Sequence, residues 1–330
     1  MDDIRFSIIT AVYNNKKYLE NAVVSVMQQN YANLEYIVVD DGSTDGTGEL
    51  ADELSKQYKN LRVIHQENKW IYASFNEGIK NAVGEYIYIL NSDDKLKEDA
   101  LEILDRSIDM YNHPDVIWTK VLLCECDDNQ NVINRIDIDE NITEDLFWKD
   151  EADLVVWHDL LRSNLMVNQA NLYKRSTIKK YEFRNDVYGA DYLFNLEIAK
   201  YIESYLIISK PIYLFHKYRN GSNASIGKYY GYEHEMYNDF YKAGLELLNR
   251  RSIDSIQNKE LIRKIRRANF TAELNAIILF DKSPINEKIN YLKENVKDEV
   301  IDSVFDDKSE IERRIEKAII RIESENTESK

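Results

Sequence analysis

The first part of the chain alternates short, continuous apolar runs with longer segments whose apolar residues recur every three or four positions. The apolar runs, rich in Ile, Val and Tyr as in strands buried on both faces, are residues 5–12, 34–39, 61–65 and 85–90. The segments with helical spacing are residues 17–29, 50–58, 73–83 and 101–108. Strands that alternate with helices of this length predict βαβ units and a mainly parallel sheet.

The pattern changes after about residue 115. Further strand-like segments are residues 116–124, 132–139, 165–173 and 206–218, with a helical segment at about 189–202. From about residue 229 the chain is almost entirely charged and helical in pattern. We therefore predict an α/β domain over residues 1–225 and an all-helical C-terminal extension over residues 226–330.

The composition of the chain limits which ligands it can bind and where in the cell it is expected. The net charge of -16 opposes broad binding of nucleic acid, so a phosphate-bearing ligand would need a local cation, an arginine or a helix N-terminus. No apolar run approaches the roughly 20 residues that span a bilayer, and the first residues do not resemble a secretory signal. The two cysteines, Cys124 and Cys126, match no disulfide, zinc or redox spacing. We expect a reduced, cytoplasmic chain without a transmembrane segment.

Two acidic clusters follow predicted strands. Asp40-Asp41-Gly42-Ser43 ends one strand, and Asn91-Ser92-Asp93-Asp94 ends another. In parallel sheets, ligands bind beyond the carboxyl ends of the strands, so both clusters are expected at one site. Neighbouring acids repel unless a cation joins them, which favours a divalent ion with oxygen ligands that can also hold phosphates. For each cluster alone, a solvated turn that caps the next helix is an equal alternative.

A third candidate acid lies in Tyr188-Gly189-Ala190-Asp191, at the start of an apolar helical segment. The helix dipole favours an ionised carboxylate at Asp191. Such a group aimed at a hydroxyl can act as a general base. Taken by itself, a simple helix cap is the favoured explanation.

Taken together, three stretches resemble the N-terminal signature of the family 2 glycosyltransferases with the GT-A fold. They are Phe6–Asn14, the helix through Ser25 and Gln28-Gln29, and Val38–Thr47. The resemblance is specific over about residues 5–95, weaker to about 225, and absent from the helical C-terminal part. It implies a Rossmann-like, mainly parallel mixed sheet flanked by helices. It also implies an enzyme that moves a sugar from a nucleotide-diphosphate donor, expected to be a UDP-sugar, to an acceptor hydroxyl.

The resemblance implies roles for matching residues at the nucleotide end of the site. Tyr13 would stack on the base with Ala11 beside it, and Asp41, with Asp40, would hydrogen-bond the uracil or the ribose. Asn68 would also lie near the base.

The resemblance likewise implies a metal and a base. Asp93 and Asp94 correspond to the acidic motif that holds a metal and the diphosphate, with Asp94 expected as the direct ligand of manganese or magnesium (Mn2+ or Mg2+). Asp191 would be the catalytic base of an inverting, single-displacement transfer. His216 and Arg219 match a segment that borders the diphosphate or the acceptor, although a structural histidine that ends a strand explains His216 equally well.

The chain departs from the family pattern at three points. Ser74-Phe75-Asn76 stands where Ala-Arg-Asn is common, which removes one expected phosphate or sugar contact. Trp70 replaces a frequent glycine, which suggests an unusual donor-sugar specificity, and Ala190 replaces the acid that commonly precedes the base. A non-catalytic nucleotide-sugar-binding protein on the same fold is therefore an alternative. A nucleotidyltransferase is a weaker one, because residues 11–17 lack the glycines of a phosphate loop.

The acceptor is left open among saccharides, lipid-linked molecules and proteins, in bacterial cell-surface polysaccharide or glycoconjugate synthesis. A basic stretch at residues 263–267 would allow peripheral contact with the inner face of the plasma membrane, although a solvated helix face is the favoured explanation. A homodimer is a further open alternative.

Overall fold

The computed structural model describes residues 4–149, 170–187, 189–218 and 231–250, residues 263 and 267, and segments 270–271, 273–278, 283–294 and 308–328. The chain divides into two compact units, Met1–Asn223 and Ala224–Lys330. This boundary lies close to the one expected near residue 225, while the functions assigned to the two parts remain predictions.

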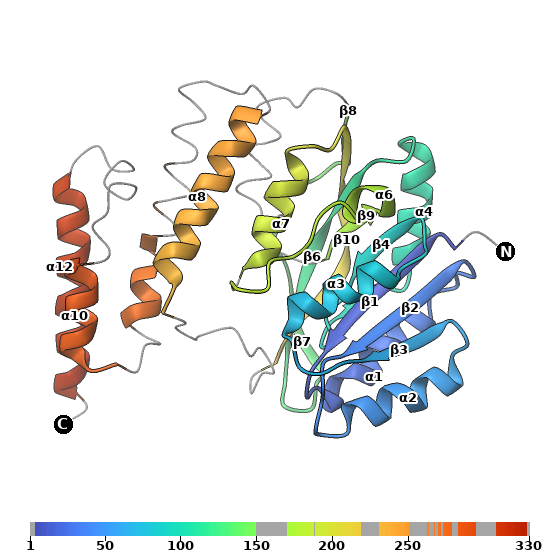
Figure 1. Cartoon of the computed structure of the whole chain (residues 1–330), viewed down its shortest axis with the longest axis horizontal. Helices are drawn as coiled ribbons and strands as arrows, with labels where there is room; N and C mark the ends of the chain where they lie inside the picture. The colour runs from blue at the N-terminus through green and yellow to red at the C-terminus, as the bar shows by residue number, and fades with distance from the viewer. Residues whose placement is uncertain are drawn as a thin grey trace. The chain divides into compact units, whose positions relative to one another are not determined.

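The first unit is built on a mixed sheet, ten-stranded among the described residues (Figure 1). The strands run in the order β3 (Leu61–His65), β2 (Leu34–Asp40), β1 (Phe6–Val12), β4 (Tyr86–Ile89), β9 (Leu172–Lys174), β6 (Val116–Cys126), β10 (Ser204–Tyr218) and β5 (Lys95–Leu96). β7 (Val132–Asp137) pairs with β6, and β8 (Leu146–Lys149) pairs with β10. Strands β1 to β4 pair in parallel, as do β6 and β10, whereas β5, β7, β8 and β9 pair antiparallel. The predicted α/β fold with a mixed sheet is confirmed.

Helices cover both faces of this sheet. Helices α1 (Lys16–Met27), α2 (Thr47–Gln57) and α4 (Ala100–Met110) share one apolar core with the even-numbered residues of β1 and β2. Side chains alternate along a strand, so the odd-numbered residues face the opposite side. There α3 (Ile71–Asn81) approaches β1 closely, since a Cβ on Gly78 would lie 2.4 Å from the Cγ2 atom of Ile9. The sheet thus lies between two helical layers.

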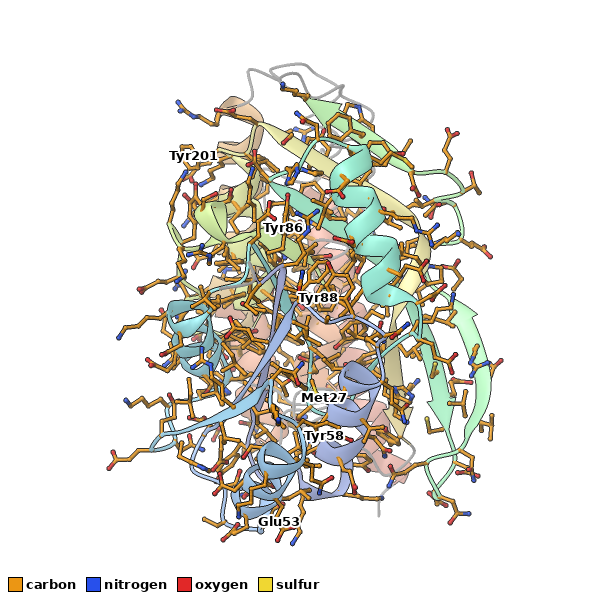
Figure 2. All side chains as sticks on the ribbon, turned by 90° about the vertical axis from the view of Figure 1, so that its right-hand side faces the viewer. Met27, Glu53, Tyr58, Tyr86, Tyr88 and Tyr201 are labelled. Atoms are coloured by element: carbon orange, nitrogen blue, oxygen red, sulfur yellow. The ribbon has the colours of Figure 1, made fainter. Side chains whose placement is uncertain are left out.

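Large aromatic side chains of the central strands fill the core beside the sheet. Tyr86 and Tyr88 of β4 are fully buried, and both lie deep among the side chains in Figure 2, whereas Glu53 and Tyr201 lie near the edge of that view. The Tyr86 hydroxyl donates to the carbonyl oxygen of Pro114 at 2.8 Å. A buried hydroxyl without a partner would destabilise the fold, so this bond allows a large aromatic ring to fill the core.

The sequence pattern did not predict three short elements. They are β5, β8 and the single-turn helix α6 (Arg175–Ile178). Each is too short to show a hydrophobic period, and tertiary pairing defines it instead. Of the strand expected at 165–173, only residues 170–173 are described, and the last two of these belong to β9.

The described segments of the second unit are almost entirely helical, which agrees with the predicted extension. Its labelled helices are α8 (Glu233–Arg250), α10 (Ile285–Glu294) and α12 (Lys308–Glu328). Leu292 of α10 and Ile311 and Ile315 of α12 share a buried apolar cluster with Phe270. Within the described residues, none of the helices has the length and apolar character needed to cross a bilayer. The basic stretch at 263–267 lies largely outside the described residues.

Candidate active site

The loop after β1 forms hydrogen bonds with both the loop that follows β2 and the loop that follows β4. The backbone N–H of Asn14 donates to the Oγ atom of Ser43 at 3.0 Å, and the N–H of Thr44 donates to the Oδ1 atom of Asn14 at 2.7 Å. On the other side, the Nδ2 atom of Asn15 donates to the Oγ atom of Ser92 at 2.6 Å. β2, β1 and β4 are parallel neighbours, so their carboxyl ends meet at one edge of the sheet. The two acidic clusters therefore flank a single loop.

Asp40 and Asp41, at the end of β2, are buried and hold this edge in shape. Asp40 accepts hydrogen bonds from the N–H of Ser43 at 3.1 Å and from Nδ1 of His65 at 2.9 Å. The Oδ1 atom of Asp41 accepts from Nε2 of Gln66 at 2.7 Å and from the N–H of Lys69 at 2.8 Å. Asp41 thus fixes segment 66–69 beside the end of β2.

Gly42 makes this close packing possible. Its φ is +75°, and a Cβ there would lie 3.0 Å from the backbone nitrogen of Asn68. Glycine is therefore required by both backbone angle and space. The predicted base contact Asn68 is exposed on this segment. Ala11 is buried within β1, while Tyr13 is 51% exposed just beyond it, which leaves its ring accessible to a flat ligand.

Asp94, the residue expected from the sequence to bind the metal directly, is held by the protein at both ends of its carboxylate. It is fully buried, and its Oδ2 atom accepts from the Tyr213 hydroxyl at 2.5 Å and from Nδ2 of Asn91 at 3.1 Å. Its Oδ1 atom accepts from the backbone N–H of His216 at 2.8 Å. Burial and the neighbouring charge of Asp93 raise the pKa of Asp94 well above its usual value. Each oxygen accepts at least one hydrogen bond from the protein, and through these bonds Asp94 joins the β4 loop to β10.

Asp93 is the better candidate for a metal ligand, because its side chain is only partly buried. Two residues before it, the Oδ1 atom of Asn91 is buried and has no hydrogen-bond partner in the structure. Carboxylate and amide oxygens suit manganese and magnesium. No cluster of three or more His, Cys, Asp or Glu side chains suited to a metal occurs among the described residues. The residues present therefore fit a site completed by substrate phosphates and water, as is common for magnesium.

His216 lies on β10 beside this loop and is buried. Its Nδ1 atom lies 2.9 Å from the carbonyl oxygen of Leu214, which can only accept, so Nδ1 carries the proton. Burial, together with the charge of Lys95, lowers the pKa of His216 to about 4, so the ring is neutral at pH 7. His216 can therefore accept a hydrogen bond through Nε2 but cannot supply charge to a diphosphate. The predicted partner Arg219 lies outside the described residues.

Asp191 lies in the first turn of α7 (Ala190–Ala199), on the face of the sheet that α3 covers. Gly189, with a φ of +79°, begins this helix. The Tyr72 hydroxyl donates to the Oδ1 atom of Asp191 at 3.4 Å and accepts from the N–H of Gly189 at 3.2 Å. Burial raises the pKa of Asp191 to about 7. A carboxylate with this pKa is well suited to take and release a proton near neutral pH.

Helix α3 holds the segment that carries Asp191, and this role was not apparent from the sequence. The side-chain amide of Asn76 exchanges two hydrogen bonds with the backbone of Phe183, at 2.8 and 2.9 Å. Phe183 stacks on Tyr72 with ring centroids 5.8 Å apart, and fully buried Phe75 lies 5.8 Å from it. Phe75, where the family has an arginine, is thus a core residue. In the sequence, the helical spacing of the aromatic residues Tyr72 and Phe75 could have indicated this contact.

Comparison with known proteins finds similarity to glycosyltransferases in both sequence and fold. Residues 7–161 match the model of the family described as Glycosyl transferase family 2. Over this segment the chain is similar to that family. Glycosyltransferase GlyG of Streptococcus pneumoniae is 46% identical over 103 residues, which cover 31% of this chain and 34% of GlyG. Bacillus subtilis TuaG, whose name assigns it to teichuronic acid biosynthesis, is 39% identical over 97 residues, covering 29% of this chain and 38% of TuaG. The chain thus spans about a third of the length of these two relatives.

Solved structures show the same fold. The Staphylococcus aureus TarS fragment 1–349, crystallised with UDP-GlcNAc, superposes with a TM-score of 0.67 at 20% identity. The match covers 96% of this chain and 88% of that structure. The fold predicted from the opening motifs is therefore confirmed.

Proposed function

We propose that the chain is a glycosyltransferase, which moves a sugar from a UDP-sugar to an acceptor hydroxyl with inversion at the anomeric carbon. One observation carries the proposal. Segment 66–72 reaches both ends of the site, since Gln66 and Lys69 contact Asp41 while Tyr72 contacts Asp191. The nucleotide end and the candidate base are thereby held on one short piece of chain. The UDP-GlcNAc bound in the TarS structure supports the choice of donor.

Each residue then has a chemical task. Tyr13 stacks on the uracil, and Asp41 accepts a hydrogen bond from the nucleoside. Asp93, with the unpartnered oxygen of Asn91, would hold manganese or magnesium, which when bound offsets charge on the diphosphate. His216 accepts a hydrogen bond through its neutral ring.

Asp191 performs the proton transfer. Its carboxylate takes the proton of the acceptor hydroxyl while that oxygen forms a bond to the anomeric carbon. The bond between the anomeric carbon and the diphosphate oxygen breaks, and its electron pair leaves with UDP. Because the carboxylate must be ionised and its pKa is about 7, turnover should rise with pH through about 7 and then level off. The name of TuaG supports a place in cell-surface polysaccharide synthesis, with a saccharide or lipid-linked acceptor.

The test is release of UDP from a panel of UDP-sugars, including UDP-GlcNAc, with Mn2+ and with EDTA. Slow hydrolysis, in which water replaces the acceptor, suffices as a readout. We expect one UDP-sugar to be cleaved, only when metal is present. Binding of UDP-sugars without any cleavage, with or without offered saccharide acceptors, would instead favour a non-catalytic nucleotide-sugar-binding protein.

A further inference from the structure

Trp70 holds a backbone conformation that is unusual for its residue type. Its φ is 77° and its ψ is 160°, a region populated essentially only by glycine. Such a conformation persists only where the surroundings impose it. Here the carbonyl oxygen of Trp70 accepts from both the N–H and the Oγ atom of Ser74, each at 3.2 Å. On the preceding residue, Lys69, the N–H donates to Asp41 and the carbonyl accepts from Nδ2 of Asn185 at 2.8 Å.

The indole side chain of Trp70 is not buried by this anchoring. It is 40% exposed, so a large apolar ring faces solvent at a position where glycine would avoid the backbone strain. Packing in the core therefore does not account for the tryptophan. A bound ligand that covers the ring would account for it, because burying an exposed aromatic face is favourable.

The location of Trp70 identifies which part of the substrate would reach it. The residue before it contacts Asp41 at the nucleotide end, and its ring centroid lies 6.3 Å from that of Tyr72, whose hydroxyl contacts Asp191. In the proposed reaction, the transferred sugar must lie between the nucleotide and the base. The diphosphate leaves from one side of the anomeric carbon and the acceptor oxygen attacks from the other.

We infer that the Trp70 indole forms the binding surface for the donor sugar, stacking on the carbon–hydrogen face of its pyranose ring. This inference rests on the proposed function. It makes Trp70 a specificity-determining residue, which selects the sugar and not the nucleotide. Aromatic stacking of this kind corresponds to an affinity difference of about 3- to 10-fold.

The experiment compares Kd values for UDP and for the UDP-sugar that the wild-type chain cleaves, with Mn2+ present. Trp70→Gly and Trp70→Ala both remove the ring, and Trp70→Phe retains an aromatic face. We expect the first two to weaken UDP-sugar binding about 3- to 10-fold while leaving UDP binding unchanged, and Trp70→Phe to recover most of the loss. Tyr201→Ala, which removes a 51% exposed aromatic ring at the far end of α7, should change neither Kd.

A second readout keeps folding separate from binding. Glycine fits the native backbone angles and alanine does not, so the Tm of Trp70→Gly should exceed that of Trp70→Ala by about 2–4 °C. Equal UDP-sugar affinity in the wild type and Trp70→Gly would overturn the inference, as would an equal loss of UDP and UDP-sugar binding. Failure of the wild type to bind or cleave any UDP-sugar would instead overturn the proposed function.

Discussion

Asp94 is fully buried and Asp191 is partly buried, and desolvation raises the pKa of each carboxylate. They differ in their hydrogen-bond partners. Asp94 accepts from Tyr213, Asn91 and the backbone of His216, so its two oxygens serve to join the β4 loop to β10. Among the residues that the structure describes, Asp191 accepts one long side-chain hydrogen bond, at 3.4 Å from the Tyr72 hydroxyl, besides bonds from backbone donors at the start of α7. A fully bonded buried acid stabilises the structure, whereas a sparsely bonded one can exchange a proton.

The largest effect should follow from removing the sparsely bonded acid. Asp191→Asn should lower kcat by about 10²- to 10⁴-fold, because no group remains to take the acceptor proton. UDP-sugar affinity, measured by calorimetry, should change little. The folded state disfavours the ionised carboxylate, since its pKa is raised, so the Tm at pH 8 should not fall below that of the wild type. Wild-type turnover in this variant would remove Asp191 from the role of base.

A matched pair of variants at the neighbouring acids should separate catalysis from stability. Asp93→Ala should lower metal-dependent kcat/KM by about 10²- to 10³-fold with little change in Tm. Asp94→Ala leaves three donors without their acceptor, two of them on the buried residues Tyr213 and His216, and should lower the free energy of unfolding by about 3 kcal/mol. Urea unfolding and UDP release measure the two effects. The assignment is contradicted if Asp94→Ala is as stable as the wild type while Asp93→Ala remains fully active.

A smaller effect should appear when the Tyr72 hydroxyl, which donates to Asp191, is removed. The Tyr72 hydroxyl lowers the pKa of Asp191, so Tyr72→Phe should raise it further above about 7. The acidic limb of the profile of kcat against pH should then move to higher pH by about 0.5 unit. A purely structural role for Tyr72 would lower activity equally at every pH and leave the limb in place.

The smallest expected effect concerns Asp40, which accepts a hydrogen bond from His65, whereas Asp94 and Asp191 accept from tyrosine hydroxyls. Hydrogen bonds to Asp40 and Asp52 raise the pKa of His65. The resulting stabilisation is present below the unfolded pKa of about 6.5 and is lost as pH rises through the higher folded value. The imidazole is 47% exposed, so the contribution should be only about 0.5 kcal/mol. His65→Gln should therefore destabilise the protein at pH 5.5 more than at pH 8.5; a larger loss at pH 8.5 would contradict this.

The sequence predicted the framework well because β1 to β4 carry continuous apolar runs and their acidic ends follow from parallel pairing. It also predicted correctly that Asp191 lies at the start of a helix, while its role as base remains a proposal that came from the family resemblance. It could not rank Asp93 above Asp94, because the difference depends on Tyr213 and His216 of β10, more than a hundred residues away. Adjacent acids look alike until the fold decides which one faces the core.

The long-range contacts of α3 could not be predicted from the sequence either. Tyr72 and Asn76 act on Asp191 and Phe183 across more than a hundred residues of chain, and spacing along a helix does not specify such partners. Trp70 was visible as a departure from the family pattern. Its strained backbone angles and its exposure became apparent only in the structure.

The most direct test is a crystal structure of the wild-type chain with UDP and Mn2+. The account predicts uracil against Tyr13 and Asp41, and metal and diphosphate at Asp93, with Asp94 still bonded to Tyr213. It also predicts that the terminal phosphate points toward the space between Trp70 and Asp191. Nucleotide bound away from the carboxyl ends of β1, β2 and β4, or a metal held by Asp94, would contradict it.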